Sequence, residues 1–221
     1  MDNAGPIVFV VDDDEAICES LRLLIEDVGL AVKTFSGARQ FLSGYDPAQE
    51  GCLVLDVRMA GMSGLELQAT LREQGNEIPT IIITGHGDVP MAVQAMKAGA
   101  LDFIEKPFRD QVLLDSIQRA IECDRKLRAK RRQLQDLHSR IGLLTQRERQ
   151  IMDLLILGKT NKTVAYELGI SQKTVDFHRA NILHKTGVGS VVDLVRLMHK
   201  APRAQAEPAE PSKAKGHSHF S

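Results

Sequence analysis

The sequence has few aromatic side chains and few cysteines. Its 221 residues include no tryptophan, and aromatic residues make up only 4% of the chain. The three cysteines, Cys18, Cys52 and Cys123, are widely scattered. That spacing indicates neither a zinc cluster nor a disulfide framework. Unpaired cysteines are typical of a reducing compartment, so we expect a cytoplasmic protein.

Long hydrophobic runs are also missing. No stretch reaches the roughly 18 consecutive apolar residues of a membrane span, so we expect no association with a membrane. The first residues contain no basic region followed by an apolar run, and a secretory signal is therefore not expected. At about 100–200 residues per domain, the length allows one large or two small domains.

Basic side chains are scarce in the first half of the chain. Residues 1–122 carry 20 Asp and Glu but only 9 Lys and Arg, whereas residues 123–200 carry 7 and 16. The formal net charge of −1 hides this asymmetry. A basic segment is a candidate for binding a polyanion, although a helical segment with a solvated basic face would have the same composition.

The first half alternates two kinds of hydrophobic pattern. Short β-branched runs without polar alternation, typical of strands buried on both faces, occupy residues 7–11, 53–55, 81–84 and 101–104, with a weaker run at 30–35. Segments with helical spacing lie between them, and three of these end at Gly29, Gly75 and Gly99. This alternation predicts an α/β domain with a doubly wound parallel sheet.

Polar residues follow the strands at the edge where such sheets carry their chemistry. Asp12, Asp13 and Asp14 follow the first strand, and Asp56, Thr84 and Lys106 follow the third, fourth and fifth. Each of these polar residues alone is typical of a helix cap or a turn. Together the carboxylates would repel one another and need a cation, for which oxygen ligands favour Mg²⁺. A lysine and a hydroxyl nearby would suit the oxygens of a phosphoryl group.

Four motifs in order make residues 5–122 resemble the receiver domain of bacterial response regulators. They are Val11-Asp12-Asp13, Asp56-Val57-Arg58-Met59, Ile83-Thr84-Gly85 and Phe103-Ile104-Glu105-Lys106-Pro107-Phe108. The resemblance implies a (βα)5, flavodoxin-like parallel sheet. It also implies phosphorylation by a sensor histidine kinase and no activity as an enzyme.

The resemblance assigns a role to each polar residue at this edge. Asp56 would be the phospho-acceptor, and Lys106 would pair with the phosphoryl group. Asp13, Asp56 and the backbone carbonyl of Arg58 would hold Mg²⁺, with Asp12 assisting through water. Thr84 and Phe103 would be the switch pair. The Lys106–Pro107 peptide bond would be cis.

Two positions depart from the common receiver pattern. Ala60 stands where many receivers have proline, which leaves the loop after Asp56 less restrained. The switch aromatic, Phe103, has no hydroxyl, so its rotation would be sensed through packing alone.

Residues 119–140 contain no glycine or proline and should be helical. Leu127, Leu134 and Ile141 are seven residues apart, which fits either a connecting helix with a half-buried stripe or a short dimerising coiled coil. We assign residues 123–140 to a helical linker.

Residues 141–200 predict a small all-α domain. Thr145 and Glu148 form a capping box before one helix, and Ser171 can cap another. Ala165, Gly169 and Val175 have the spacing that lets two helices cross closely in a helix-turn-helix.

Wider motifs in this segment resemble the LuxR-type DNA-binding domain. They are Leu144-Thr145-Gln146-Arg147-Glu148-Arg149, Gly158-Lys159-Thr160-Asn161-Lys162, Ile170-Ser171-Gln172-Lys173-Thr174-Val175 and Phe177-His178-Arg179. With the receiver, the chain resembles transcriptional regulators of the FixJ/NarL family, most nearly the FixJ branch. The helix starting at Ser171 would enter the major groove of promoter DNA.

The candidate DNA contacts fall into two groups. Groove contacts are predicted for Lys173, Thr174, Phe177, His178 and Arg179, with Arg179 suited to guanine, and Ser171 at the start of the same helix is included in the DNA-binding set. Asp176 on that helix could accept from cytosine, repel a phosphate or pair with a neighbouring basic group. Asn161, Lys162 and Lys185 are predicted to hold phosphates, which set position and not sequence. His178 has packing as its alternative role. Residues 201–221 predict a disordered tail, in which His217 and His219 are weak metal candidates.

The sequence thus predicts a transcription factor of a two-component system. Phosphorylation would make the receiver dimerise and bring two recognition helices to half-sites about one DNA turn apart, with RNA polymerase as a further partner. Two rival hypotheses remain. One treats the acidic cluster as a phosphatase or hydrolase site, and the other has the chain bind DNA constitutively.

Overall fold

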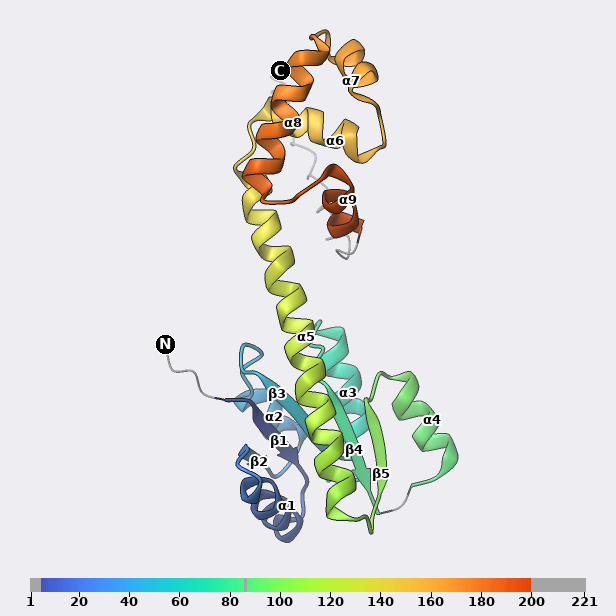
Figure 1. The fold of residues 1–221 in the computed structure, drawn as a ribbon. Coiled ribbons are helices and arrows are strands. Elements are labelled where there is room, and N and C mark those ends of the chain that lie inside the picture. Colours follow the sequence, from blue (N-terminus) through green and yellow to red (C-terminus); the bar gives the residue numbers. More distant parts are fainter. Residues whose placement is uncertain (1–4, 86, 200–221) are drawn as a thin grey trace, which may run out of the picture. The chain divides into compact units, whose positions relative to one another are not determined.

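The structure is a computed structural model that describes residues 5–85 and 87–199. The chain divides into two compact units, with the division between Lys130 and Arg131 (Figure 1). The predicted tail of residues 201–221, with His217 and His219, lies outside the described residues. Over the described residues, no helix is both long and apolar enough to cross a membrane.

The first unit is built on a five-stranded parallel sheet. Its strands are β1 (Ile7–Val11), β2 (Ala31–Phe35), β3 (Gly51–Asp56), β4 (Thr80–Thr84) and β5 (Asp102–Glu105), in the order β2-β1-β3-β4-β5. All residues of β3 and β4 are buried, which explains their unbroken apolar runs. The predicted α/β fold with a parallel sheet is confirmed.

Helices cover both faces of this sheet (Figure 1). Val8 and Val10 of β1 point to the face packed by α1 (Glu15–Asp27) and α5 (Asp110–Gly142). Phe9 and Val11 point to the opposite face, which is packed by α2 (Ala38–Gly44), α3 (Gly64–Glu73) and α4 (Val89–Lys97). This period-two alternation gives the unit two separate hydrophobic cores.

Helix α2 is absent from the sequence prediction. It has only seven residues and follows Gly37, which provides no side-chain cap. Its signal lies in the apolar spacing of Ala38, Phe41 and Tyr45. Phe41 is fully buried and its ring stacks on Tyr45 with 4.8 Å between centroids. Aromatic packing rather than capping therefore holds this short helix.

Helix α5 has 33 residues and includes parts of both units. In the first unit, buried Asp124 accepts hydrogen bonds from the Gly51 amide at 2.9 Å and from Arg128 Nε at 2.6 Å. The Arg128 guanidinium also donates to the backbone carbonyls of residues 47–49. A Cβ at position 51 would lie 1.8 Å from the Ile7 carbonyl oxygen, so the start of β3 beside β1 requires glycine.

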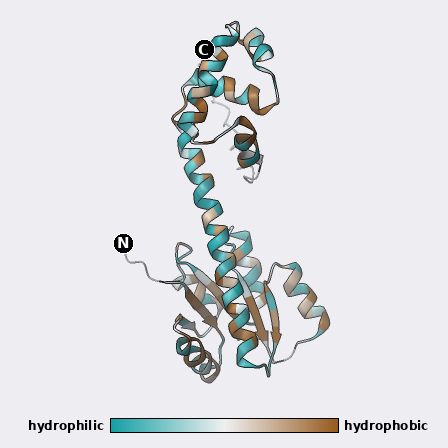
Figure 2. Ribbon diagram, viewed as in Figure 1, coloured by the Kyte–Doolittle hydropathy of each residue, from teal (hydrophilic) through white to brown (hydrophobic). Residues whose placement is uncertain are grey.

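Residues 123–140, predicted as a helical linker, are helical and lie within α5, on both sides of the division between the units. The first part of this segment is bound to the first unit through Asp124 and Arg128, while Leu137 is buried in the core of the second. Ile141 and Leu144 pack in the same second core, so part of the predicted heptad stripe is used inside that unit. Helix α5 is mostly hydrophilic along its middle, in contrast to the hydrophobic strands (Figure 2).

The second unit is all-α. It contains the end of α5 and the helices α6 (Gln146–Ile156), α7 (Asn161–Leu168), α8 (Gln172–Thr186) and α9 (Val191–His199). They enclose a core that includes Ile151, Val164, Val175, Ile182 and Leu194. The predicted capping box before α6 and the Ser171 cap of α8 are both confirmed.

Candidate functional site

The predicted polar residues of the first unit line one hollow at the carboxyl edge of the sheet. It has a volume of about 220 Å³. Its lining includes Asp12, Asp13, Asp14, Asp56, Arg58, Thr84 and Lys106. These residues lie at the carboxyl ends of β1, β3, β4 and β5, either as the last strand residue or in the loop that follows. The parallel register brings the strand ends to the same edge, so residues far apart in the sequence meet there.

Asp56 is the last residue of the buried strand β3, and only 5% of its surface is exposed. Its Oδ2 accepts a hydrogen bond from the Arg58 amide at 2.7 Å. Gly64, the first residue of α3, lies so close that a Cβ there would be 2.2 Å from the Asp56 carbonyl oxygen. Close packing of α3 against the end of β3 therefore depends on glycine at position 64.

Lys106 joins two carboxylates across the hollow. Its Nζ lies 2.8 Å from Asp12 Oδ2 and 3.0 Å from Asp56 Oδ1. Burial raises the pKa of the Asp56 carboxyl above its usual range, although the Lys106 ammonium acts in the opposite direction. Burial alone would lower the pKa of Lys106, but its hydrogen bonds to Asp12 and Asp56 outweigh burial and raise it. The lysine is therefore charged and aimed at the Asp56 carboxylate.

The loop between β1 and α1 holds three consecutive acids in different ways. Asp12 Oδ1 accepts from the Asp14 amide at 2.9 Å. Asp14 caps α1 by accepting from the amides of Ala16 and Ile17. Asp13 is exposed, and its Oδ2 accepts from the Ala60 amide at 2.8 Å. Asp14 therefore has a structural role as the cap of α1, whereas Asp12 and Asp13 supply carboxylates to the lining of the hollow.

The hollow offers oxygen ligands that suit a hard cation. Asp13, Asp56 and the peptide carbonyl of Arg58 would be the ligands, as the sequence predicts, and Mg²⁺ commonly takes one or two carboxylates and keeps several waters. Among the described residues, no group of three or more Asp, Glu, His or Cys side chains is placed to hold a metal ion, so a cation here would also need backbone and water oxygens. The donor set therefore fits a partly hydrated Mg²⁺ and does not fit a closed structural metal site.

The predicted switch residues lie near each other around Gly87. Thr84, the last residue of β4, is 1% exposed, and Phe103 lies on the neighbouring strand β5. A Cβ at Gly87 would lie 3.0 Å from Phe103 Cε1 and 3.5 Å from Thr84 Cγ2. Glycine at this position leaves space for the phenylalanine ring beside the threonine. The Lys106–Pro107 peptide bond is cis, as predicted.

The second unit contains a helix-turn-helix. Thr160 caps α7, and the helix ends at Gly169 in the left-handed conformation, with φ of 63°. Ser171 caps α8 by accepting from the Thr174 amide at 3.1 Å. Ala165 and Val175 are both buried where the two helices pack together, as their spacing predicts. The turn therefore fixes α7 against α8.

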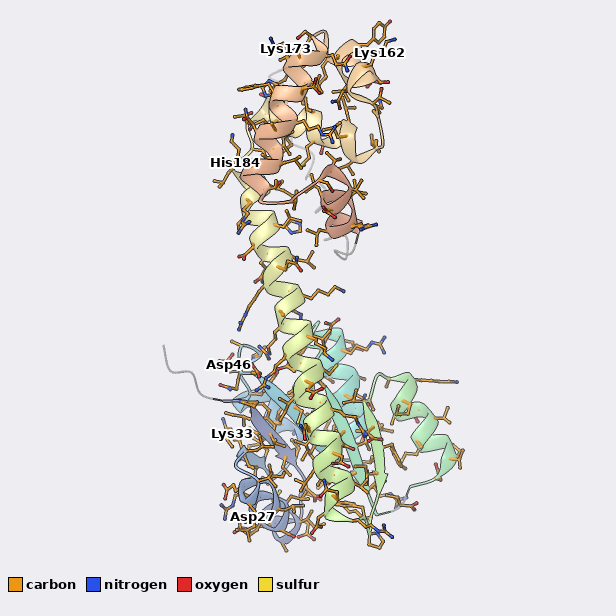
Figure 3. The ribbon with its side chains drawn as sticks, viewed as in Figure 1. Asp27, Lys33, Asp46, Lys162, Lys173 and His184 are labelled. Carbon is orange, nitrogen blue, oxygen red and sulfur yellow. The ribbon has the colours of Figure 1, made fainter. Side chains whose placement is uncertain are left out.

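Several predicted DNA contacts point outward from this motif. Lys162, Lys173 and Phe177 are exposed, and Phe177 exposes 63% of its surface despite being apolar. Lys162 and Lys173 lie at the same end of the second unit, whereas His184 lies farther along α8 (Figure 3). Tyr166, which is 89% exposed, was not among the predicted contacts. Its signal is its position four residues after Lys162 on the same short helix.

Four other candidates have partners inside the unit. Asn161 donates to Asp176, which joins the start of α7 to α8. The Ser171 hydroxyl, besides its capping bond, lies 2.8 Å from the Thr174 hydroxyl. Thr174 is half-buried. Arg179, a further candidate on the same helix, is also half-buried.

Lys185 differs most from its predicted role. Its ammonium pairs with buried Glu148 at 2.7 Å instead of projecting toward a phosphate. The cause is the capping box, because Glu148 turns inward to accept from the Thr145 amide and needs a positive partner. His178 is half-buried and its ring makes an edge contact with the Phe177 ring, while its Nδ1 is buried without a hydrogen-bond partner among the described residues.

Comparison with known proteins identifies a family for each of the two units. Residues 8–118 match the family model of the response regulator receiver domain, and residues 142–198 match that of bacterial regulatory proteins of the luxR family. The chain therefore belongs to the two-component response regulators with a LuxR-type DNA-binding domain, a family of transcriptional regulators and not of classical enzymes.

Individual relatives match along most of their length. The transcriptional regulatory protein FixJ of Azorhizobium caulinodans is 44% identical over 205 residues, which cover 93% of this chain and 97% of the relative. The response regulator protein TodT of Pseudomonas putida is 43% identical over 90% of this chain and 88% of its own. A solved structure of the response regulator StyR is 47% identical, covers 90% of this chain and 100% of its own, and has a TM-score of 0.75.

Proposed function

We propose that this protein accepts a phosphoryl group on Asp56 from a sensor histidine kinase and, as a receiver-mediated dimer, binds promoter DNA to regulate transcription. The observation that carries the proposal is the Asp56 carboxylate in the hollow, with the Lys106 ammonium 3.0 Å from Oδ1. An anionic nucleophile beside a fixed cation is the arrangement that phosphoryl transfer requires.

The transfer exchanges one bond to phosphorus for another. An Asp56 carboxylate oxygen attacks the phosphorus of a phosphohistidine, forming an O–P bond while the P–N bond breaks and the histidine leaves. Lys106 neutralises charge on the phosphoryl oxygens, which is worth most in a site shielded from water. Mg²⁺ held by Asp13, Asp56 and the Arg58 carbonyl would supply further charge neutralisation.

The Thr84 hydroxyl and the Phe103 ring would convert this charge into a change of shape. A new phosphoryl group on Asp56 offers oxygens to which the Thr84 hydroxyl can donate from the adjacent strand. Movement of Thr84 would free space for Phe103, whose ring lies beside Gly87. Because Phe103 has no hydroxyl, the change would be transmitted by packing of the β5 face, which we expect to promote self-association.

The DNA-binding unit supports the second half of the proposal. Lys162 supplies positive charge for a phosphate. On α8, the exposed Lys173 can reach base edges in the major groove, and the exposed Phe177 can contact a thymine methyl there. RNA polymerase would be the further partner through which DNA binding alters transcription.

The test measures intact mass and light-scattering mass of the full-length protein with Mg²⁺, before and after acetyl phosphate. We expect one phosphoryl group to be added and a monomer to become a dimer. Asp56→Asn should abolish both changes. Asp14→Asn is the matched control, because asparagine also caps helices and Asp14 caps α1.

The alternative outcomes separate the rival functions. A phosphoryl group added to Asp56→Asn would contradict the assignment of the acceptor. Equal DNA affinity of wild type and Asp56→Asn in the presence of acetyl phosphate would favour constitutive binding. Repeated turnover of a small phosphate ester would favour a hydrolase.

A further inference from the structure

The loop between β3 and α3 reaches back to the first acidic loop through one hydrogen bond. The Ala60 amide donates to Asp13 Oδ2 at 2.8 Å, joining residues 47 positions apart in the chain. The Ala60 side chain itself is exposed. The contact therefore depends on the backbone N–H and not on the alanine methyl group.

Only a residue with an amide hydrogen can make this contact, and proline has none. Ala60 precedes Gly61, whose φ is 84°. The position before a glycine of positive φ is one at which turns commonly accept proline. Proline at position 60 would therefore remove the donor at a position that proline can occupy in such turns.

We propose that the Ala60 amide is a positioning group for the cation site, holding the Asp13 carboxylate ready to bind Mg²⁺. This inference rests on the proposed function, because it requires Mg²⁺ at Asp13 and Asp56. The hydrogen bond uses Oδ2 and leaves Oδ1 of Asp13 available to the cation. Since Asp13 is exposed, its side chain would otherwise sample several rotamers and lose that freedom on binding.

The same bond links metal binding to the loop that carries the third ligand. Arg58, whose carbonyl would contact Mg²⁺, lies two residues before Ala60, and its amide is bonded to Asp56 Oδ2. The segment from Arg58 to Ala60 thus donates to both carboxylates of the proposed site. Donors that orient ligating carboxylates in this way typically change metal affinity 10–100-fold when removed.

The main test measures the Mg²⁺ dissociation constant of the full-length protein by calorimetry. Ala60→Pro should weaken binding by about tenfold. Ala60→Ser, which keeps the amide hydrogen, should restore an affinity close to that of wild type. Urea unfolding of both variants without Mg²⁺ establishes that they fold. An Ala60→Pro protein that binds Mg²⁺ as tightly as Ala60→Ser overturns the inference.

A second measurement needs no proline variant. Hydrogen exchange of the Ala60 amide, followed by nuclear magnetic resonance in wild type, should be slow without Mg²⁺ and remain slow when Mg²⁺ is added. Faster exchange on adding Mg²⁺ would mean that the cation breaks the bond, which contradicts a positioning role.

The two proposals fail in different ways. If the wild type binds Mg²⁺ and Asp56 is phosphorylated, but the proline has no effect, only the role of Ala60 is lost. If the wild type binds no Mg²⁺, the cation site of the proposed function is lost together with this inference.

Discussion

At the scale of single residues, the hollow holds two buried carboxylates, Asp12 and Asp56, that share one ammonium. Burial raises the pKa of Asp56, so its charged form destabilises the folded receiver. We expect Asp56→Asn to raise the thermal midpoint by a few degrees at pH 7 without Mg²⁺, because Lys106 keeps Asp12 as its partner.

The pH dependence gives the sign of this effect. A carboxyl whose pKa is raised by folding carries no penalty below its ordinary pKa of about 3.9, where both states are protonated. The rise in thermal midpoint caused by Asp56→Asn should therefore shrink as the pH is lowered from 7 toward about 4. Calorimetric scans across this range test it, and a midpoint below that of wild type at pH 7 would contradict it.

At the scale of elements, the capping box of α6 is part of a larger cluster. Glu148 Oε2 accepts from the Thr145 amide and hydroxyl and from Lys185 of α8. Burial alone would raise the pKa of Glu148, but hydrogen bonds from Lys185 and Thr145 outweigh it and lower the pKa. The cluster therefore stabilises the second unit at pH values above the ordinary pKa of a glutamate. This stabilisation is lost as the pH falls through the lowered pKa of Glu148.

We expect Thr145→Ala to destabilise the second unit by about 1 kcal/mol, the usual cost of losing an N-cap. Glu148→Ala should cost more, because it also leaves Lys185 without its partner. Urea unfolding followed by helical circular dichroism measures both. Gln146→Ala, an exposed change in the first turn of α6, is the control. Equal costs for all three variants would contradict the cluster.

At the scale of the whole molecule, the charges are divided between an acidic first half and a basic second half. Affinity for DNA should therefore come from the second unit and fall steeply with salt. We expect Lys162→Ala to weaken binding to all sequences and to reduce the slope of log K against log salt by about 1.

Arg179→Ala should instead reduce the preference for the selected sequence, by about 1–3 kcal/mol if Arg179 contacts guanine. Fluorescence anisotropy at several salt concentrations, with a duplex selected from a random pool and a scrambled one, separates the two effects. Lys97→Ala on α4 of the receiver is the matched control for loss of a lysine. A slope for Lys162→Ala equal to that of the control would remove Lys162 from the interface.

Patterns that repeat locally were predictable from the sequence. Buried apolar runs gave the strands, and chain order placed Asp56, Thr84 and Lys106 at one edge of the sheet. Contacts such as Ala60 with Asp13, or Lys185 with Glu148, join residues 47 and 37 positions apart and follow no local period. Whether a surface lysine meets a phosphate or a buried glutamate depends on such tertiary contacts, which the sequence does not display.

The bonds of Asp124 and Arg128 bear on how this protein can be recombined with others. A receiver cut at residue 122, or at the family boundary of 118, discards both side chains. The buried Gly51 amide then loses its acceptor, and the carbonyls of residues 47–49 lose their donor. A chimaera that grafts this receiver onto a foreign output domain should therefore be joined after Lys130, where the first unit ends.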